Sequence, residues 1–292
     1  MEKYYFKIAN INFEVNIENK YCRYYCNENY YQFFNKDFNL PNVSIDYIYT
    51  NIESYDSILP NIKWKKAGLA GKYSSKKNKL MFLANIYHHG IVVGEKLIVC
   101  SKNMEKLKVY FNADILLDHF YLELMIAINT ILAKNMTGVI LHATGIVDIA
   151  LQKAYVFMGD SGAGKSTIAK LISQKSSGFK VLSDDRVVVK KEEAGFYVYG
   201  TPWISDTKQK LNEFGKLEYF FFLYHGNHLH MEEENRTSLK RKLILNIFDF
   251  PLWDSSCTYN LFKVCEQMIG ELCGFNLYFS LSSDFSSFFN EL

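Results

Sequence analysis

One segment of this chain constrains its fold more than any other. Residues 159–166 read Gly-Asp-Ser-Gly-Ala-Gly-Lys-Ser, which is the Gly-four-residues-Gly-Lys-Ser pattern of a phosphate-binding loop, or P-loop. The apolar run 155–158 before it predicts a buried strand, and residues 167–172 after it predict a helix. A strand that turns through such a loop into a helix belongs to a sheet flanked by helices, so we expect a mixed α/β (α+β) fold. The alternative is a glycine-rich turn that matches the pattern by chance.

The residue types in this loop suit the binding of a nucleoside triphosphate. Gly159, Gly162 and Gly164 allow the backbone to curl so that successive amide groups point inward. These amides, together with the positive end of the following helix, can hold phosphate oxygens. The residues expected to bind the nucleotide are Gly159, Asp160, Ser161, Gly162, Ala163, Gly164, Lys165, Ser166 and Thr167.

Three side chains at the end of the loop have individual roles in this interpretation. Lys165 is expected to reach the β- and γ-phosphates with its positive charge. The hydroxyl of Ser166 is expected to bind Mg²⁺, and Thr167 to lie on the α-phosphate side. ATP and Mg²⁺ are therefore the predicted cofactors.

Two adjacent carboxylates follow the loop along the chain. Asp184 and Asp185 come directly after a short predicted strand, 180–183. One helix and a turn separate this strand from the loop, so we expect it to lie beside the P-loop strand with its end facing the phosphates. One carboxylate can then help to hold the metal, while the other accepts a proton from a hydroxyl nucleophile. The alternative is an exposed Asp-Asp turn that makes local backbone hydrogen bonds.

The chain is expected to divide into a β-rich N-terminal part, 1–110, and a nucleotide-binding domain, 111–292. Strands are predicted where apolar and polar residues alternate, and a helix where apolar residues recur with the helical period. The predicted strands are 4–17, 43–49, 79–87, 90–100, 139–143, 145–149, 186–190, 196–199, 219–224 and 277–281, and the predicted helices are 112–133, 260–273 and 286–292. Residues 225–237 are predicted to form a polar loop.

Charge and composition narrow the range of partners. The net charge is only +2, which does not favour nucleic acid or an anionic membrane surface as the main partner. The most hydrophobic long stretch, 115–132, contains Asp118 and Glu123, which would be costly in lipid, so no membrane span is expected. The N-terminus lacks the apolar run of a signal peptide, which favours a cytoplasmic location.

The six cysteines are expected to be free thiols in that compartment. Cys22 and Cys26 are close in sequence, but no second close pair completes a zinc site. Cys265 and Cys273 lie in an apolar, helical context and are expected to be buried in the core.

In these motifs the chain resembles the HPr kinase/phosphorylase superfamily, which shares its nucleotide-binding core with phosphoenolpyruvate carboxykinases. The matching segments, in chain order, are 141–144 (Leu-His-Ala-Thr), 159–167, 182–187 (Leu-Ser-Asp-Asp-Arg-Val) and 200–203 (Gly-Thr-Pro-Trp). The last of these, with 219–223, 234–236 and 251–254, is similar to a branch found beside peptide-modifying genes, including kinases of lasso-peptide precursors. The resemblance implies a P-loop kinase core with Asp184 and Asp185 at the active site.

The resemblance also implies roles for individual residues. One aspartate would act as base toward a serine hydroxyl; we favour Asp184 as base and Asp185 on the metal side. His142 is either a residue of the site or a histidine of the core. Trp203 either stacks on a base or peptide or packs in the core. The metal-binding Glu-Val-Arg-Gly-type segment of HPr kinases and their arginine-containing C-terminal segment have no counterpart here, so phosphorylase activity and HPr as substrate are not implied.

The predicted activity is that of an ATP-dependent kinase. It would transfer the γ-phosphate to a hydroxyl, most readily a serine of a peptide or protein. One alternative is a nucleotide-hydrolysing or nucleotide-gated binding module without kinase activity. Another is a kinase of a small molecule such as an amino acid or a sugar. A carboxykinase-like enzyme is less favoured, because no arginine cluster near the loop would clamp a dicarboxylate.

Overall fold

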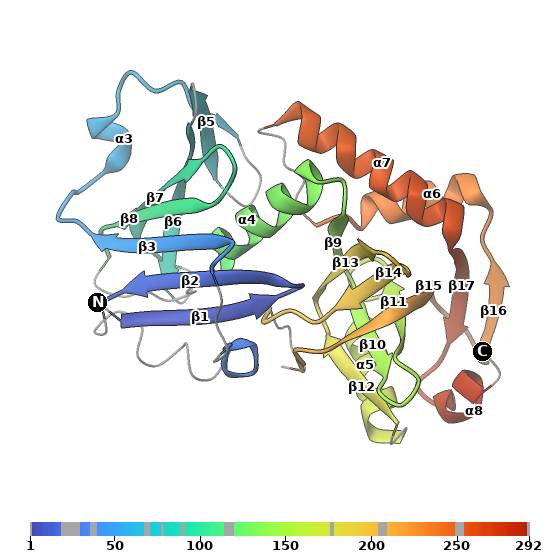
Figure 1. Ribbon diagram of the computed structural model, residues 1–292. Helices are drawn as coiled ribbons and strands as arrows, with labels where there is room; N and C mark the ends of the chain where they lie inside the picture. Colours follow the sequence, from blue (N-terminus) through green and yellow to red (C-terminus); the bar gives the residue numbers. More distant parts are fainter. Residues whose placement is uncertain are drawn as a thin grey trace. The chain divides into compact units, whose positions relative to one another are not determined.

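The chain folds into two compact units, each with its own sheet (Figure 1). The computed structural model describes residues 2–18, 30–35, 40–66, 71–76, 79–88, 91–113, 120–175, 178–203, 209–248 and 254–290. The first unit comprises Met1–Ile131 and Asp249–Thr258, and the second comprises Leu132–Phe248 and Tyr259–Leu292. The expected mixture of helices and strands is therefore observed.

The first unit is built on an eight-stranded sheet with the order β1-β2-β3-β8-β7-β6-β5-β4. Its strands are β1 (Glu2–Ile8), β2 (Ile11–Ile17), β3 (Val43–Tyr49), β4 (Lys65–Lys66), β5 (Lys72–Lys76), β6 (Lys79–His88), β7 (Ile91–Ser101) and β8 (Lys106–Phe111). Two short helical segments, η1 (Tyr31–Phe33) and α3 (Tyr55–Ile58), accompany them. The strand predicted over 4–17 is in fact the hairpin β1–β2, which turns at Ala9 and Asn10 with φ of 50° and 62°.

The helix predicted over 112–133 begins later than expected. Helix α4 spans Tyr121–Lys134, and residues 114–119 lie outside the described residues. Asn112 does not start the helix, because its side chain accepts from the Glu95 N–H (2.6 Å) and donates to the Ile52 carbonyl (2.6 Å). The start of α4 is tied to the first sheet, since Lys96 of β7 pairs with Glu123 at 2.9 Å. The first unit therefore extends to residue 131, beyond the boundary expected at 110.

The second unit contains a nine-stranded sheet. Its main path runs β12-β10-β11-β15-β14-β13-β9; β17 also pairs with β15, and β16 pairs with β17. The strands are β9 (Gly138–His142), β10 (Thr144–Asp148), β11 (Lys153–Met158), β12 (Phe179–Ser183), β13 (Arg186–Glu192), β14 (Gly195–Tyr199), β15 (Phe214–His225), β16 (His230–Glu233) and β17 (Cys273–Phe279). The helices are α5 (Lys165–Lys175), α6 (Arg236–Leu245), α7 (Ser255–Glu271), which belongs to this unit from Tyr259 onward, and α8 (Phe285–Asn290).

Strand order is where the sequence-based expectation was wrong. The strand before the two aspartates, β12, does not lie beside the P-loop strand β11, because β10 lies between them. Strand β10 is antiparallel to both neighbours, so β11 and β12 run in the same direction and end at the same edge of the sheet. The aspartates are therefore still brought to the edge where the loop lies. Strand β9 pairs with β13.

The C-terminal part of the second unit also differs from expectation. The predicted polar loop 225–237 contains strand β16 and the start of α6, a helix that begins where the Asn235 side chain accepts from the Ser238 N–H (3.0 Å). Helix α7 ends at Glu271, so Cys273 opens β17 and is exposed rather than buried. Cys265 is buried as expected, and burial raises the pKa of its thiol to about 12. Cys22 and Cys26 lie outside the described residues.

Candidate functional site

The glycine-rich loop has the local structure that its sequence predicts. Strand β11 is buried along its last five residues and ends at Met158, and helix α5 begins at Lys165. Gly162 and Gly164 have φ of 83° and 103°, which residues with side chains rarely adopt. A Cβ at Gly164 would also lie 2.5 Å from the Phe279 ring. The turn from strand to helix therefore requires glycine on both steric and conformational grounds.

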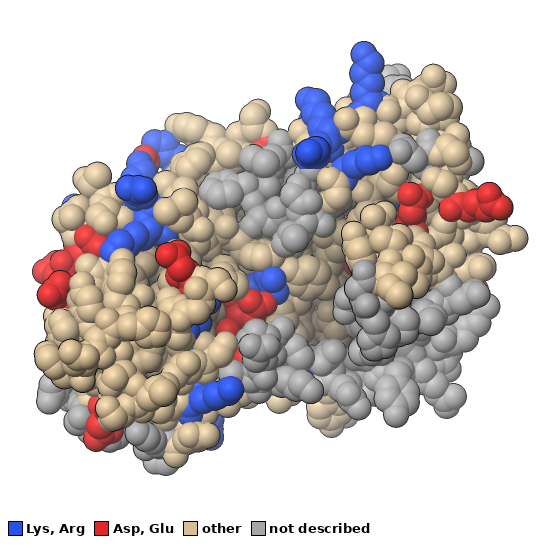
Figure 2. Space-filling model, turned by 180° about the vertical axis from the view of Figure 1, so that it is seen from behind, with Lys and Arg blue, Asp and Glu red and all other residues tan. Residues whose placement is uncertain are grey.

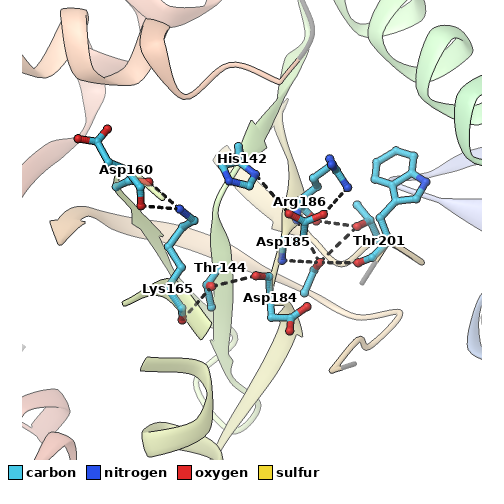
Figure 3. A network of polar contacts seen from close by, with 11 residues as sticks. His142, Thr144, Asp160, Lys165, Asp184, Asp185, Arg186 and Thr201 are labelled. Carbon is cyan, nitrogen blue, oxygen red and sulfur yellow. Dashed lines mark hydrogen bonds and ion pairs between the residues drawn. The ribbon is translucent and has the colours of Figure 1, made fainter. Parts of the chain in front are cut away.

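The Lys165 side chain folds back over the start of the loop (Figure 3). Its Nζ donates to the carbonyls of Gly159 (2.6 Å) and Asp160 (3.1 Å), which leaves one of its three donors for a ligand. Burial lowers the pKa of Lys165, and the negative charges of Asp185 and Asp160 oppose this shift. The first N–H groups of α5 have no partner within the helix, as at any helix start. A cation and amide donors therefore lie together at the loop.

The sheet edge beside the loop gathers residues from four strand ends. Thr144, the first residue of β10, is fully buried, and its Oγ1 lies 3.2 Å from the Lys165 carbonyl and 3.4 Å from the Asp184 carbonyl. The Ala143 N–H donates to the Asp185 carbonyl at 3.0 Å. These bonds connect the start of α5 to the turn that carries the two aspartates. Thr144 belongs to the 141–144 motif, but nothing in that motif indicated this connecting role.

The Asp185 side chain is held by two neighbours. Its Oδ1 lies 3.3 Å from Nδ1 of His142, and its Oδ2 accepts from the Arg186 guanidinium. Arg186 and His142 are opposite each other in the β13–β9 ladder, and the guanidinium lies 4.0 Å above the Phe248 ring. His142 is thus brought to the predicted site rather than buried in the core, since 41% of its side chain is exposed.

The two aspartates differ in orientation. Asp184 and Asp185 are only 1% and 9% exposed, so the alternative of an exposed Asp-Asp turn is wrong. In Figure 3 the Asp184 carboxylate lies on the far side of its own backbone from the Lys165 ammonium, whereas the Asp185 carboxylate lies between His142 and Arg186. Of the two aspartates, Asp185 is the one whose charge acts on Lys165.

Hydroxyl groups fix the turn around these carboxylates. Ser183 Oγ accepts from the Arg186 N–H (3.3 Å) and donates to the Trp203 carbonyl (3.0 Å). Thr201 Oγ1 donates to the Arg186 carbonyl at 2.6 Å. Trp203 itself is 3% exposed and packs in the core, so it does not offer a face to a base or peptide. Sequence reasoning placed these residues in motifs but did not foresee that 200–203 would hold the aspartate turn.

The residues at this edge suit a magnesium-bound nucleotide only in part. The hydroxyl of Ser166 at the start of α5 and an aspartate carboxylate are the hard oxygen ligands that Mg²⁺ prefers. Asp185 Oδ2 accepts from the Arg186 guanidinium, whereas Oδ1 lies 3.3 Å from His142 Nδ1 without a hydrogen bond to it, so Oδ1 is the oxygen left for a ligand or a proton. The described residues include no group of three or more His, Cys, Asp and Glu that could hold a metal. Magnesium bound with phosphate needs no such group, since it keeps several waters.

On the face drawn in Figure 2, basic and acidic side chains of the described residues occur in small interspersed groups, in keeping with the net charge of +2. Within the described part of the chain, no helix is long and apolar enough to cross a membrane. No protein-family model matches the sequence, and no curated protein matches it significantly.

Proposed function

We propose that this chain is an ATP-dependent kinase with a P-loop core of the HPr kinase/phosphoenolpyruvate carboxykinase type, which transfers the γ-phosphate of ATP to a serine hydroxyl of a peptide or protein. The observation that carries the proposal is that the glycine-rich loop with Lys165 and the turn with the two aspartates lie at one sheet edge, joined through the buried Thr144 hydroxyl. A phosphate-binding cation and a carboxylate base are the two groups that such a transfer needs.

Each part of the edge has a task in this proposal. The loop amides, Lys165 and Thr167 would hold the triphosphate, and Ser166 would hold Mg²⁺, whose charge would offset that of the phosphates. An aspartate carboxylate takes the proton of the acceptor hydroxyl. The hydroxyl oxygen forms a bond to the γ-phosphorus as the bond from that phosphorus to the bridging oxygen breaks, and ADP leaves with the electron pair.

Both aspartates are candidates for the base, and their geometry supports Asp185. Its carboxylate lies between His142 and Arg186, with Oδ1 3.3 Å from His142 Nδ1 and Oδ2 accepting from Arg186. The Asp184 carboxylate points away from the Lys165 ammonium. The backbone carbonyl of Asp184 lies 3.4 Å from the Thr144 hydroxyl, a contact that supports the aspartate turn. The family resemblance favoured Asp184 as the base, and this proposal assigns that role to Asp185 instead. The variants Asp184→Asn and Asp185→Asn, made separately, distinguish the two assignments.

The decisive experiment is transfer of label from ATP. The purified protein is incubated with Mg²⁺, γ-labelled ATP and the peptide products of neighbouring genes, and mass spectrometry locates any added phosphate. Label on a serine that disappears with Lys165→Ala supports the proposal. Fast hydrolysis of ATP without any acceptor would contradict it in favour of a hydrolysing module, and label on an added amino acid or sugar would assign a small-molecule kinase.

A further inference from the structure

A cleft lies on the β15 side of the glycine-rich loop, opposite to the strands that lead to the aspartates. Its volume is about 520 Å³, which is within the usual range for small-molecule sites. One wall is the start of the loop, 159–163; a second is the end of β15, 222–225; the third is helix α6. The backbone carbonyl of Asn246, at the end of that wall, accepts from the backbone N–H of His142 at 2.8 Å. The cleft therefore adjoins the contacts that His142 makes with Asp185.

Helix α6 presents a regular stripe to this cleft. Ser238, Arg241, Lys242 and Leu245 line it, at spacings of three and four residues that place them on one face of a helix. A different face carries Leu239 and Leu243, which are buried. Leu239 packs closely against Gly274 of β17, where a Cβ would lie 2.5 Å from its Cδ1. The packed face fixes the direction in which the stripe points.

The two cationic side chains on this face of α6 differ in the partners that they contact. Lys242 Nζ donates to Asn276 Oδ1 at 2.5 Å and pairs with Glu234, so its charge is compensated. Arg241 is exposed and makes no hydrogen bond or ion pair with any of the described residues. A guanidinium offers five donors in a planar fork suited to phosphate oxygens. Arg241 is therefore a cation of the cleft whose donors are not taken up by any residue that the structure describes.

The position of Lys165 indicates which end of a nucleotide would face this cleft. In a P-loop the lysine reaches the β- and γ-phosphates. Here its ammonium bonds the carbonyls of Gly159 and Asp160, at the start of the loop. Those two residues also line the cleft. The terminal phosphate would thus lie at the mouth that Arg241 faces.

We propose that Arg241 binds the γ-phosphate of the nucleotide from the cleft side and stabilises the charge on it during transfer. The inference rests on the proposed nucleotide site and adds a second protein cation to Lys165. The two cations would approach the phosphate from different elements, α5 and α6. Such an arginine on the transferring group is among the largest single contributions to phosphoryl transfer.

The test compares ATP with ADP, which lacks the γ-phosphate. Titration calorimetry with Mg²⁺ measures both affinities for the native protein and for Arg241→Gln. We expect ATP to bind about tenfold more weakly to the variant, which is the scale of one charge-assisted hydrogen bond. ADP affinity should stay within about twofold, and Arg241→Lys should lie between the two. Added guanidinium ion should restore part of the transfer rate to Arg241→Ala.

The neighbouring residue provides a matched control. Lys240 pairs with Glu266 at 2.8 Å and does not line the cleft, so Lys240→Gln removes the same charge from the same helix and should leave both affinities unchanged. Equal losses for ATP and ADP in Arg241→Gln, or no loss for either, would overturn the role of Arg241 while the nucleotide site stands. A native protein that binds neither nucleotide would refute the proposed function itself.

Discussion

Each unit of this protein buries a carboxylate beside cations, and the two cases differ instructively. In the first unit Glu123 is fully buried on α4 and, among the described residues, pairs with Lys96 at 2.9 Å. In the second unit Asp185 lies at a sheet edge with His142 and Arg186 against its carboxylate. A buried charge is therefore present in both, but only one of them adjoins a glycine-rich loop.

The difference shows what separates a structural ion pair from a candidate site. The Glu123 pair matches one charge with one, among buried apolar neighbours such as Leu122 and Leu124. At the loop, Lys165 uses two donors on backbone carbonyls and keeps one for a ligand. A buried charge that is paired affects only the stability of the fold, favourably or unfavourably. Hydrogen-bond donors that are left for a ligand indicate a binding site.

The largest expected effect is at the loop. Lys165→Ala should reduce ATP binding and phosphoryl transfer below detection, because the loop loses the only side-chain cation in its own sequence. Calorimetry and label transfer measure the two. Lys170→Ala, an exposed lysine on the same helix, should bind ATP normally. Full activity in Lys165→Ala would refute the P-loop assignment.

The next effect concerns the first unit. Lys96→Met should destabilise it by about 3–5 kcal/mol, because Glu123 is left buried without a counter-charge. Hydrogen exchange of the β7 and β8 amides measures this change in opening free energy. ATP affinity should be unaffected under conditions where the protein is folded. Replacing both partners, with Lys96→Met and Glu123→Leu, should recover most of the loss; a double variant as unstable as the single one would show that the ion pair is not the cause.

The smallest effect is expected from the aspartates. Asp185→Asn should lower the rate of phosphoryl transfer by roughly 10²-fold, the scale of a lost general base, while ATP affinity changes little. Single-turnover transfer measures the rate. Asp184→Asn is the internal comparison: a drop larger than that of Asp185→Asn would exchange their roles. Normal rates in both variants would remove the pair from the site and leave it, like the Glu123 pair, a structural feature.

The accuracy of the sequence-based predictions depended on the range of the interactions involved. The strand, loop and helix around 159–166 were predicted closely, because glycine conformation and apolar periodicity act over a few residues. Helix α6 was missed, since only Leu239 and Leu243 of its residues are buried and the rest of the segment reads as polar loop. The start of α4 was misplaced because the side chain of Asn112 bonds to residues far away in sequence.

The sequence by itself determined that a glycine-rich turn from strand to helix would form and that two carboxylates would follow it. Only the tertiary structure decided that β10 lies between β11 and β12, that His142 and Arg186 hold Asp185, and that Arg241 of α6 lines the same cleft as the start of the loop. The physical reason is that loop geometry depends on the conformational freedom of a few adjacent residues. Strand order and helix docking depend instead on pairing and burial between segments far apart in the chain, which no local pattern encodes.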